Sequence, residues 1–91
     1  MRIVKFLESP HVRILLFLHH HGLVRHKRLA KELSSRGTLS NVLNELLMDG
    51  LIIRYVKIEN KPIQSFYSLT DLGREVATRL EEIINLLGIS L

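Results

Sequence analysis

Residues 38–52 read Thr-Leu-Ser-Asn-Val-Leu-Asn-Glu-Leu-Leu-Met-Asp-Gly-Leu-Ile, and this stretch decides the fold. Its leucines recur at i, i+4, i+7 and i+8, which is the spacing of one buried helix face; they are Leu39, Leu43, Leu46 and Leu47. We therefore expect a helix from about Thr38 to Asp49 that is ended by Gly50. Short polar side chains occupy other faces of this helix, namely Thr38, Ser40, Asn41 and Asn44.

A shorter helix is expected just upstream, from about His26 to Ser34, and its buried stripe consists of Leu29, Ala30 and Leu33. A turn at residues 34–37 joins the two helices. Two short helices joined by a tight, glycine-bearing turn form the helix-turn-helix pattern, whose second helix enters the major groove of DNA. Ser35 and Thr38 are both good N-caps, so the start of the second helix stays open between them.

The remaining elements follow from caps and turns. Ser9 and Pro10 open a helix that Gly22 ends, and residues 22–24 are a strand fragment. Residues 3–7 are apolar and basic, and either a short helix or an arm fits them. Residues 51–58 and 63–69 are rich in β-branched and aromatic residues and flank the turn-forming tip 59–62, so they predict a β-hairpin.

A last helix is expected from Asp71 to about Leu87, with Thr70 as its N-cap. Its apolar side chains recur at i, i+4, i+7, i+8 and i+11; they are Val76, Leu80, Ile83, Ile84 and Leu87. The whole chain is thus a mainly α protein with a small β-hairpin. With 91 residues and no visible internal linker, residues 1–91 are expected to form a single domain.

Two segments resemble the winged-helix transcriptional regulators of the MarR, ArsR and HxlR families. Residues 39–46, followed by Asp49-Gly50-Leu51-Ile52, are similar to their recognition helix and its exit. Residues 67–74, Tyr-Ser-Leu-Thr-Asp-Leu-Gly-Arg, resemble their Tyr-x-Leu-Thr-x-x-Gly signature, and Pro62 is similar to the HxlR wing. The resemblance covers roughly residues 9–80 and implies a winged helix-turn-helix (9–70) followed by a C-terminal dimerisation helix (71–91). The chain lacks the cysteines of HxlR and ArsR sensors.

Positive charge is concentrated in the helix-turn-helix and the hairpin. The formal net charge is +4, and Arg25, Lys27, Arg28, Lys31 and Arg36 lie within twelve residues that hold one acid, Glu32. The hairpin adds Arg54, Lys57 and Lys61. From Asp71 onward the balance reverses to four acids against two arginines. Such a distribution suits a DNA surface, because phosphate contacts supply affinity while base contacts select the site.

We therefore expect a sequence-specific regulator of transcription that binds double-stranded DNA. The helix at 38–49 would enter the major groove, and the wing at 54–66 would lie on the backbone or in the minor groove. The expected DNA contacts are Arg25, Lys27, Arg28, Arg36, Thr38, Ser40, Asn41, Asn44, Lys57 and Lys61. Two alternatives remain: a winged-helix module for protein interaction, and a non-specific architectural DNA-binding protein.

The apolar stripe of the last helix predicts a homodimer. In so short a chain the stripe is expected to exceed what the core can cover, and pairing with a second copy would bury it. The predicted interface consists of Val76, Leu80, Ile83, Ile84 and Leu87. The alternative is that the stripe folds back on its own domain.

Other functions find little support. Without cysteine there is no disulfide, thiolate zinc site or cysteine nucleophile. Three consecutive histidines, His19 to His21, cannot all face one ion while helical, so we expect no metal and no cofactor. No phosphate loop or catalytic triad pattern appears, which argues against an enzyme. No apolar run is long enough to cross a membrane and no signal peptide is apparent, so the default expectation is a cytoplasmic protein.

Overall fold

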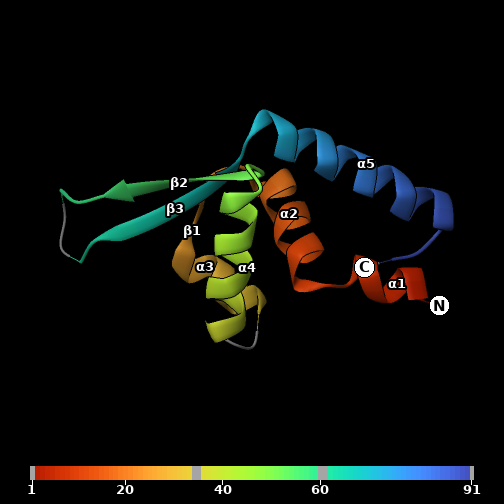
Figure 1. The fold of residues 1–91 in the computed structure, drawn as a ribbon, viewed down its shortest axis with the longest axis horizontal. Helices are drawn as coiled ribbons and strands as arrows, with labels where there is room; N and C mark the ends of the chain where they lie inside the picture. Colours follow the sequence, from red (N-terminus) through yellow and green to blue (C-terminus); the bar gives the residue numbers. More distant parts are fainter. Residues whose placement is uncertain (1, 34–35, 60–61, 91) are drawn as a thin grey trace.

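The structure, a computed structural model, describes residues 2–33, 36–59 and 62–90, and the side chain of Arg36 lies outside that description. The elements are α1 (Arg2–Leu7), α2 (Pro10–His21), β1 (Val24–Arg25), α3 (His26–Glu32), α4 (Arg36–Met48), β2 (Ile52–Lys57), β3 (Gln64–Leu69) and α5 (Asp71–Leu87). The hairpin of β2 and β3 projects from one side of the helices, while α1 and α5 lie at the other end (Figure 1). The molecule measures 45 × 27 × 21 Å along its principal axes.

Most of the predicted elements are confirmed, with differences in bounds near the chain start, at β1, at the end of α3 and at the start of α4. The stretch at residues 3–7, which the sequence allows as a helix or an arm, is the helix α1. The helix α4 begins at Arg36, two residues before the predicted start, so Thr38 lies inside its first turn and is not the N-cap. The other cap candidate, Ser35, falls outside the described residues. Gly37 is compatible with this earlier start, because Gly is less costly in the first turn than in the middle of a helix.

The strand fragment predicted at residues 22–24 lies one residue further on, as β1 at Val24–Arg25, and it completes a three-stranded antiparallel sheet with the order β1-β3-β2. Val24 of β1 pairs with Tyr67, and Arg54 of β2 pairs with the same Tyr67 on the other side. Cross-strand partners share a face, so Ile52, Arg54 and Tyr67 lie on one face and Tyr55 and Phe66 on the other. The first face contains the buried residues Ile52, Tyr67 and Leu69, and it is the face that packs on the helices.

The core forms around α2, which contacts α4, α5 and β3. The largest fully buried side chains come from α1, α2, α3 and α4; they are Leu7, Ile14, Leu18, Leu29, Leu39 and Leu43. Burying such aliphatic side chains stabilises a fold by about 1.5–3 kcal/mol each. The helix-turn-helix is therefore fixed on α2, which leaves the opposite side of α4 free.

The junction between the hairpin and α5 explains the Leu-Thr-x-x-Gly signature. The hydroxyl of Thr70 donates a hydrogen bond to the Gly50 carbonyl at 2.6 Å and accepts one from the Gly73 amide at 2.9 Å. The Thr70 amide donates to the Leu51 carbonyl at 3.1 Å. Thr70 is thus the predicted N-cap of α5, and it also ties α5 to the exit of α4. The orientation of the wing follows from this junction.

Candidate nucleic-acid interface

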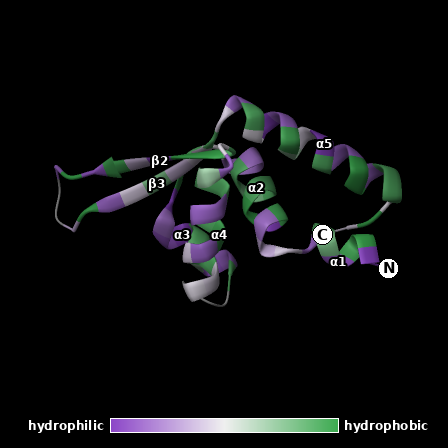
Figure 2. Ribbon diagram, viewed as in Figure 1, coloured by the Kyte–Doolittle hydropathy of each residue, from purple (hydrophilic) through white to green (hydrophobic). Residues whose placement is uncertain are grey.

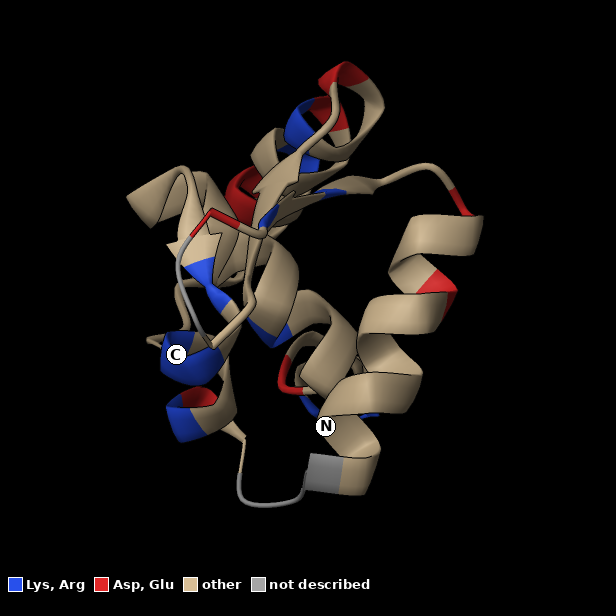
Figure 3. Ribbon diagram, turned by 90° about the vertical axis from the view of Figure 1, so that its left-hand side faces the viewer, with Lys and Arg blue, Asp and Glu red and all other residues tan. Residues whose placement is uncertain are grey.

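The outer face of α4 presents short polar side chains to solvent. Thr38, Ser40, Asn41 and Asn44 are all exposed, whereas Leu39, Leu43 and Leu46 are buried beneath them. Between Gly37 and Met48 the helix contains no Lys or Arg. Figure 3 shows α4 as the long helix at the right, marked by acidic residues, while basic residues lie on the shorter helix and the strands to its left. A helix face of short hydrogen-bonding side chains, flanked by basic elements, suits contact with base edges beside a phosphate backbone.

Basic side chains from β1 and α3 line a groove against the wing. Arg25 and Lys27 are exposed, and together with His26 they face residues 62–65 across a cavity of about 240 Å³. Arg28 is also exposed, but its guanidinium lies over the ring of Phe17 on α2, 5.4 Å from the ring centroid. The predicted basic residues of this segment therefore divide between the wing groove, which holds Arg25 and Lys27, and the α2 side, which holds Arg28.

A second cavity, of about 300 Å³, lies between α4 and the wing, and we call it the wing pocket. Its lining residues come from α3, α4, β2 and β3; they are His26, Ser40, Leu43, Asn44, Arg54, Ser65 and Tyr67. Arg54 donates a hydrogen bond to the Ser65 hydroxyl at 3.4 Å. Burial raises the pKa of the Tyr67 phenol above its ordinary value of 10.0, and the nearby Arg54 charge acts in the opposite direction.

The wing places Arg54 and Lys57 on opposite faces of the sheet. Arg54 shares the face of Tyr67 and lines the wing pocket, beside Ser40 and Asn44 of α4. The ammonium group of Lys57 lies over the Phe66 ring at 5.4 Å, on the face turned away from the helices. From the sequence, Lys57 is predicted to contact DNA, whereas Arg54 is named only as one of the positive charges of the hairpin. In the described part of the wing, Arg54 is the cation that lies beside α4. Lys61 and the side chain of Arg36, also predicted to contact DNA, lie outside the described residues.

The basic residues of α3 and the wing differ from those of α5 in their pairing. On α5, Arg79 contacts Glu75 at 3.0 Å and Glu82 at 3.2 Å, and Arg74 lies 3.8 Å from Asp71. Within the described ranges, no Lys or Arg of β1, α3 or the wing forms an ion pair. The positive charge near α4 is therefore not neutralised by neighbouring carboxylates of these ranges and is available to a polyanion.

The predicted dimer stripe on α5 is divided between the core and the surface. Leu80 and Ile84 are only 8% and 7% exposed, and Val76 is half-buried against the core. The chain's own domain covers these residues, because α5 packs on α2. Ile83 and Leu87 remain 39% exposed, and Leu86 is 86% exposed. Figure 2 shows hydrophobic residues recurring along α5 and on α1, at the end of the molecule away from the wing.

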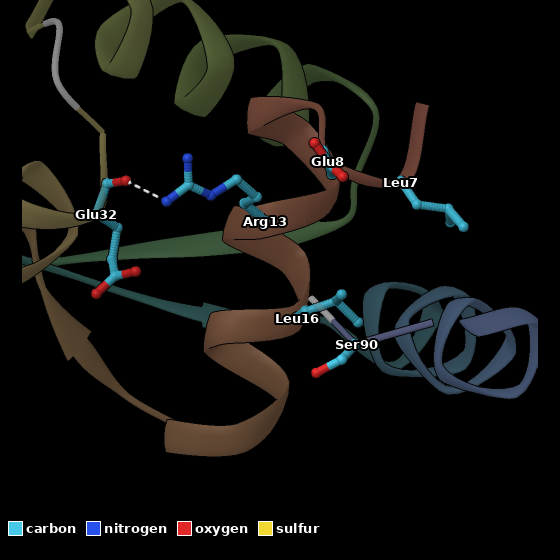
Figure 4. Close-up of a pocket in the computed structure, with 6 residues that line it drawn as sticks. All are labelled: Leu7, Glu8, Arg13, Leu16, Glu32 and Ser90. Atoms are coloured by element: carbon cyan, nitrogen blue, oxygen red, sulfur yellow. Dashed lines mark hydrogen bonds between the residues drawn. The ribbon is translucent and has the colours of Figure 1, made fainter. Parts of the chain in front are cut away.

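Another cavity has a volume of about 510 Å³. It is lined by residues of α1, α2, α3 and the C-terminal segment; they are Leu7, Glu8, Arg13, Leu16, Glu32 and Ser90 (Figure 4). The Arg13 guanidinium donates a hydrogen bond to the Glu32 carbonyl at 2.8 Å, as the dashed line in Figure 4 shows. Arg13 therefore joins α2 to the end of α3, and this cavity is separate from the basic surface.

Of the three consecutive histidines, His20 contacts an acid, and so does His11 at the start of α2. His20 of α2 contacts Glu81 of α5, and His11 lies 3.4 Å from Glu45. Among residues 2–33, 36–59 and 62–90, no three His, Asp or Glu side chains are grouped so as to hold a metal ion. The helices in the same ranges include none with the length and hydropathy needed to cross a membrane.

The fold and this surface together define a winged helix-turn-helix domain, the DNA-binding unit of many transcriptional regulators. A family model described as the HxlR-like helix-turn-helix matches residues 9–88. The chain belongs to the HxlR-like helix-turn-helix family, and it is a DNA-binding transcriptional regulator. The resemblance to winged-helix regulators is confirmed, and of the three families MarR, ArsR and HxlR the family model that matches is that of HxlR.

Solved structures share the fold at low sequence identity. The protein ytfH from Salmonella typhimurium superposes with a TM-score of 0.73 and 24% identity, over 96% of this chain and 79% of its own. A transcriptional regulator homologue from Pyrococcus horikoshii OT3 superposes with a TM-score of 0.73 and 24% identity, over 93% of this chain and 90% of its own. A MarR-family protein from Porphyromonas gingivalis W83 superposes with a TM-score of 0.73 and 23% identity, over 99% of this chain and 89% of its own. A comparison with curated proteins finds no match.

Proposed function

We propose that the protein binds double-stranded DNA in a sequence-specific manner, with α4 in the major groove and the wing against the backbone. The observation that carries this proposal is the exposed polar face of α4, flanked by basic side chains without acidic partners among the described residues. Asn41 and Asn44 suit adenine, with which an amide side chain forms two hydrogen bonds. Ser40 and Thr38 contact bases or phosphates, while Arg25 and Lys27 contact phosphates.

We further propose that two copies bind together through the exposed part of the α5 stripe. Ile83, Leu86 and Leu87 are large apolar side chains on one end of α5, and Ile3 and Phe6 of α1 are also exposed. Exposed apolar patches of this kind indicate an interaction surface, and a two-fold dimer would place two recognition helices about 34 Å apart on successive half-sites.

The sequence-specificity proposal is tested with Asn41→Ala on selected and random duplexes. Removing one hydrogen-bonded base contact is expected to cost about 1–3 kcal/mol on the preferred duplex and little on random DNA. Asn85→Ala makes the same substitution on an exposed residue of α5 and serves as the control. An equal reduction of affinity for both duplexes would show that Asn41 is not a base contact.

The two alternatives give different results in the same assay. A protein-interaction module would fail to bind duplex DNA even at low salt, since nothing would neutralise phosphates. An architectural protein would bind selected and random duplexes with a ratio near one. A regulator is expected to prefer its site by a factor of at least about 10³ at physiological salt.

A further inference from the structure

We propose that the wing pocket binds one phosphate of the DNA backbone, with Arg54 supplying the charge and the Tyr67 hydroxyl supplying a hydrogen bond. This inference rests on the proposed function and adds a defined anion site to it. The sequence pattern assigns neither residue to DNA contact, and in it Tyr67 belongs only to the signature at the end of the wing.

Tyr67 combines a buried ring with an unused hydroxyl. The residue is only 5% exposed, and its ring lies 5.9 Å from the ring of His26. Its hydroxyl forms no hydrogen bond to any residue in the described part of the chain. Over the same residues, no enclosed side-chain oxygen or nitrogen lacks a partner, so the Tyr67 oxygen is not fully enclosed, and Tyr67 is one of the residues that line the wing pocket. A phenol in this position is a donor ready for an acceptor that enters the pocket.

The electrostatics of the pocket select an anion as that acceptor. Arg54 is a cross-strand partner of Tyr67 and shares its sheet face, and its charge acts on the Tyr67 phenol. The hydrogen bond from Arg54 to the Ser65 hydroxyl, at 3.4 Å, is long and leaves other guanidinium donors for a ligand. The described residues that line the pocket include no Asp or Glu. A guanidinium, a phenol and a serine hydroxyl around one space match the tetrahedral oxygens of a phosphate group.

The position of the pocket indicates where the phosphate comes from. Ser40 and Asn44 line it from α4, and Ser65 and Tyr67 line it from the wing. With α4 in the major groove, the DNA strand bordering that groove passes between the recognition helix and the wing. Its backbone phosphate then lies at the pocket mouth. Free inorganic phosphate has the same chemistry, and the experiment must separate the two sources.

The first test compares two tyrosines that differ in the face they occupy. Tyr67→Phe removes only the hydroxyl that faces the pocket, while Tyr55→Phe makes the same change on the opposite face of the sheet. Tyr67→Phe is expected to weaken duplex binding about tenfold on selected and random sequences alike, the effect of removing a hydrogen bond to a charged acceptor. Tyr55→Phe is expected to leave the affinity unchanged. Equal affinities for Tyr67→Phe and the wild type would overturn the proposal.

The second test identifies the phosphate itself. A set of duplexes carries one neutral methylphosphonate each, at every backbone position in turn. The affinity of the wild type should fall when the methylphosphonate stands at one defined position. The affinity of Arg54→Gln should not be reduced by the methylphosphonate at that position. Arg54→Gln should also reduce the slope of log affinity against log salt by about 0.9. A methylphosphonate profile identical for Arg54→Gln and the wild type would overturn the proposal, as would a pocket titrated by inorganic phosphate without any sensitive DNA position.

The two proposals fail in different ways. If the wild type binds no duplex at low salt, the proposed function falls and this inference falls with it. If the wild type binds but Tyr67→Phe and Arg54→Gln behave like it, only the inference is wrong. Thermal unfolding of each variant confirms that it is folded, and Arg54→Gln, at an exposed position, carries the test if Tyr67→Phe proves unfolded.

Discussion

At the scale of single residues, the hydrogen that serves as the Gly73 side chain is what allows α5 to approach the exit of α4. A Cβ at Gly73 would lie 1.9 Å from the carbonyl oxygen of Leu51 and 2.9 Å from its carbonyl carbon. Leu51 is fixed by the same junction, because its carbonyl accepts the Thr70 amide. The glycine of the signature is therefore required by contact with a neighbouring backbone, which the sequence spacing alone does not reveal.

Gly73→Ala is expected to lower the free energy of unfolding by about 3 kcal/mol or more, because a backbone segment must move. Gly50 provides a matched comparison. Its φ of +73° is strained for alanine, but open space surrounds it, so Gly50→Ala should cost about 1–2 kcal/mol. Urea unfolding of the two variants measures the difference. If Gly73→Ala is the milder change, the packing of α5 on Leu51 is described incorrectly.

Tyr67 makes stability depend on pH in the alkaline range. Burial raises its pKa in the folded state above 10.0, the ordinary value expected in the unfolded chain. The folded protein therefore holds the phenol proton more tightly. The resulting stabilisation is fully present below pH 10.0 and is lost as the pH rises through the folded-state pKa. Urea midpoints at rising alkaline pH should fall more steeply for the wild type than for Tyr67→Phe. Parallel curves for the two proteins would contradict this assignment.

At the scale of elements, helix faces could be predicted from the sequence better than strand faces. The bounds of α5 follow from the Thr70 cap and a regular apolar repeat, and the structure confirms them. The wing differs, because its residues alternate between two faces and a register shift of one residue exchanges them. The pairing of Arg54 with Tyr67, which places Arg54 beside α4, depends on that register. Sequence counting therefore could not distinguish the role of Arg54 from that of Lys57.

The apolar stripe of α5 shows a related limit. Periodicity indicates that one side of the helix is covered, but it does not say by what. In the structure α2 covers Leu80 and Ile84, while Ile83 and Leu87 remain partly at the surface. Only part of the stripe from which the dimer was predicted is therefore free to contact a second copy.

Two aspartate substitutions on α5 separate core from interface. Leu80→Asp places a charge in the core and is expected to unfold the domain, at a cost of several kcal/mol. Leu87→Asp, at a residue that is 39% exposed, should leave unfolding almost unchanged and should dissociate the proposed dimer. Circular dichroism reports the first effect and sedimentation the second. A wild type that sediments as a monomer at micromolar concentration would refute the dimer.

At the scale of the whole molecule, the basic surface near α4 lies at the other end from the apolar side chains that α1 and the end of α5 expose, while the wing exposes apolar side chains of its own, such as Ile58 and Ile63. Cations without acidic partners among the described residues gather on α3 and the wing, whereas the arginines of α5 are paired with its own acids. The exposed apolar residues of α1 and α5 lie at the far end (Figure 2). This separation suits a protein that contacts DNA with one end and a second copy of itself with the other.

Salt dependence tests this separation. The double variant Arg25→Gln, Lys27→Gln should weaken binding to all duplexes and reduce the slope of log affinity against log salt by about 0.9 for each phosphate that is no longer neutralised. Arg79→Gln removes a charge already paired with Glu75 and Glu82, and it should leave the slope unchanged. Equal slopes for the double variant and the wild type would exclude Arg25 and Lys27 from the DNA surface.

The central claim is that α4 reads sequence, and selection of bound duplexes from a random pool measures this most directly. We expect an enriched motif that repeats with two-fold symmetry at a spacing of about one helical turn, bound at least about 10³ times more tightly than random DNA. We also expect Asn41→Ala to relax the motif at one position of each half-site. A pool that shows no enriched sequence, with affinities near one another for all duplexes, would contradict the claim.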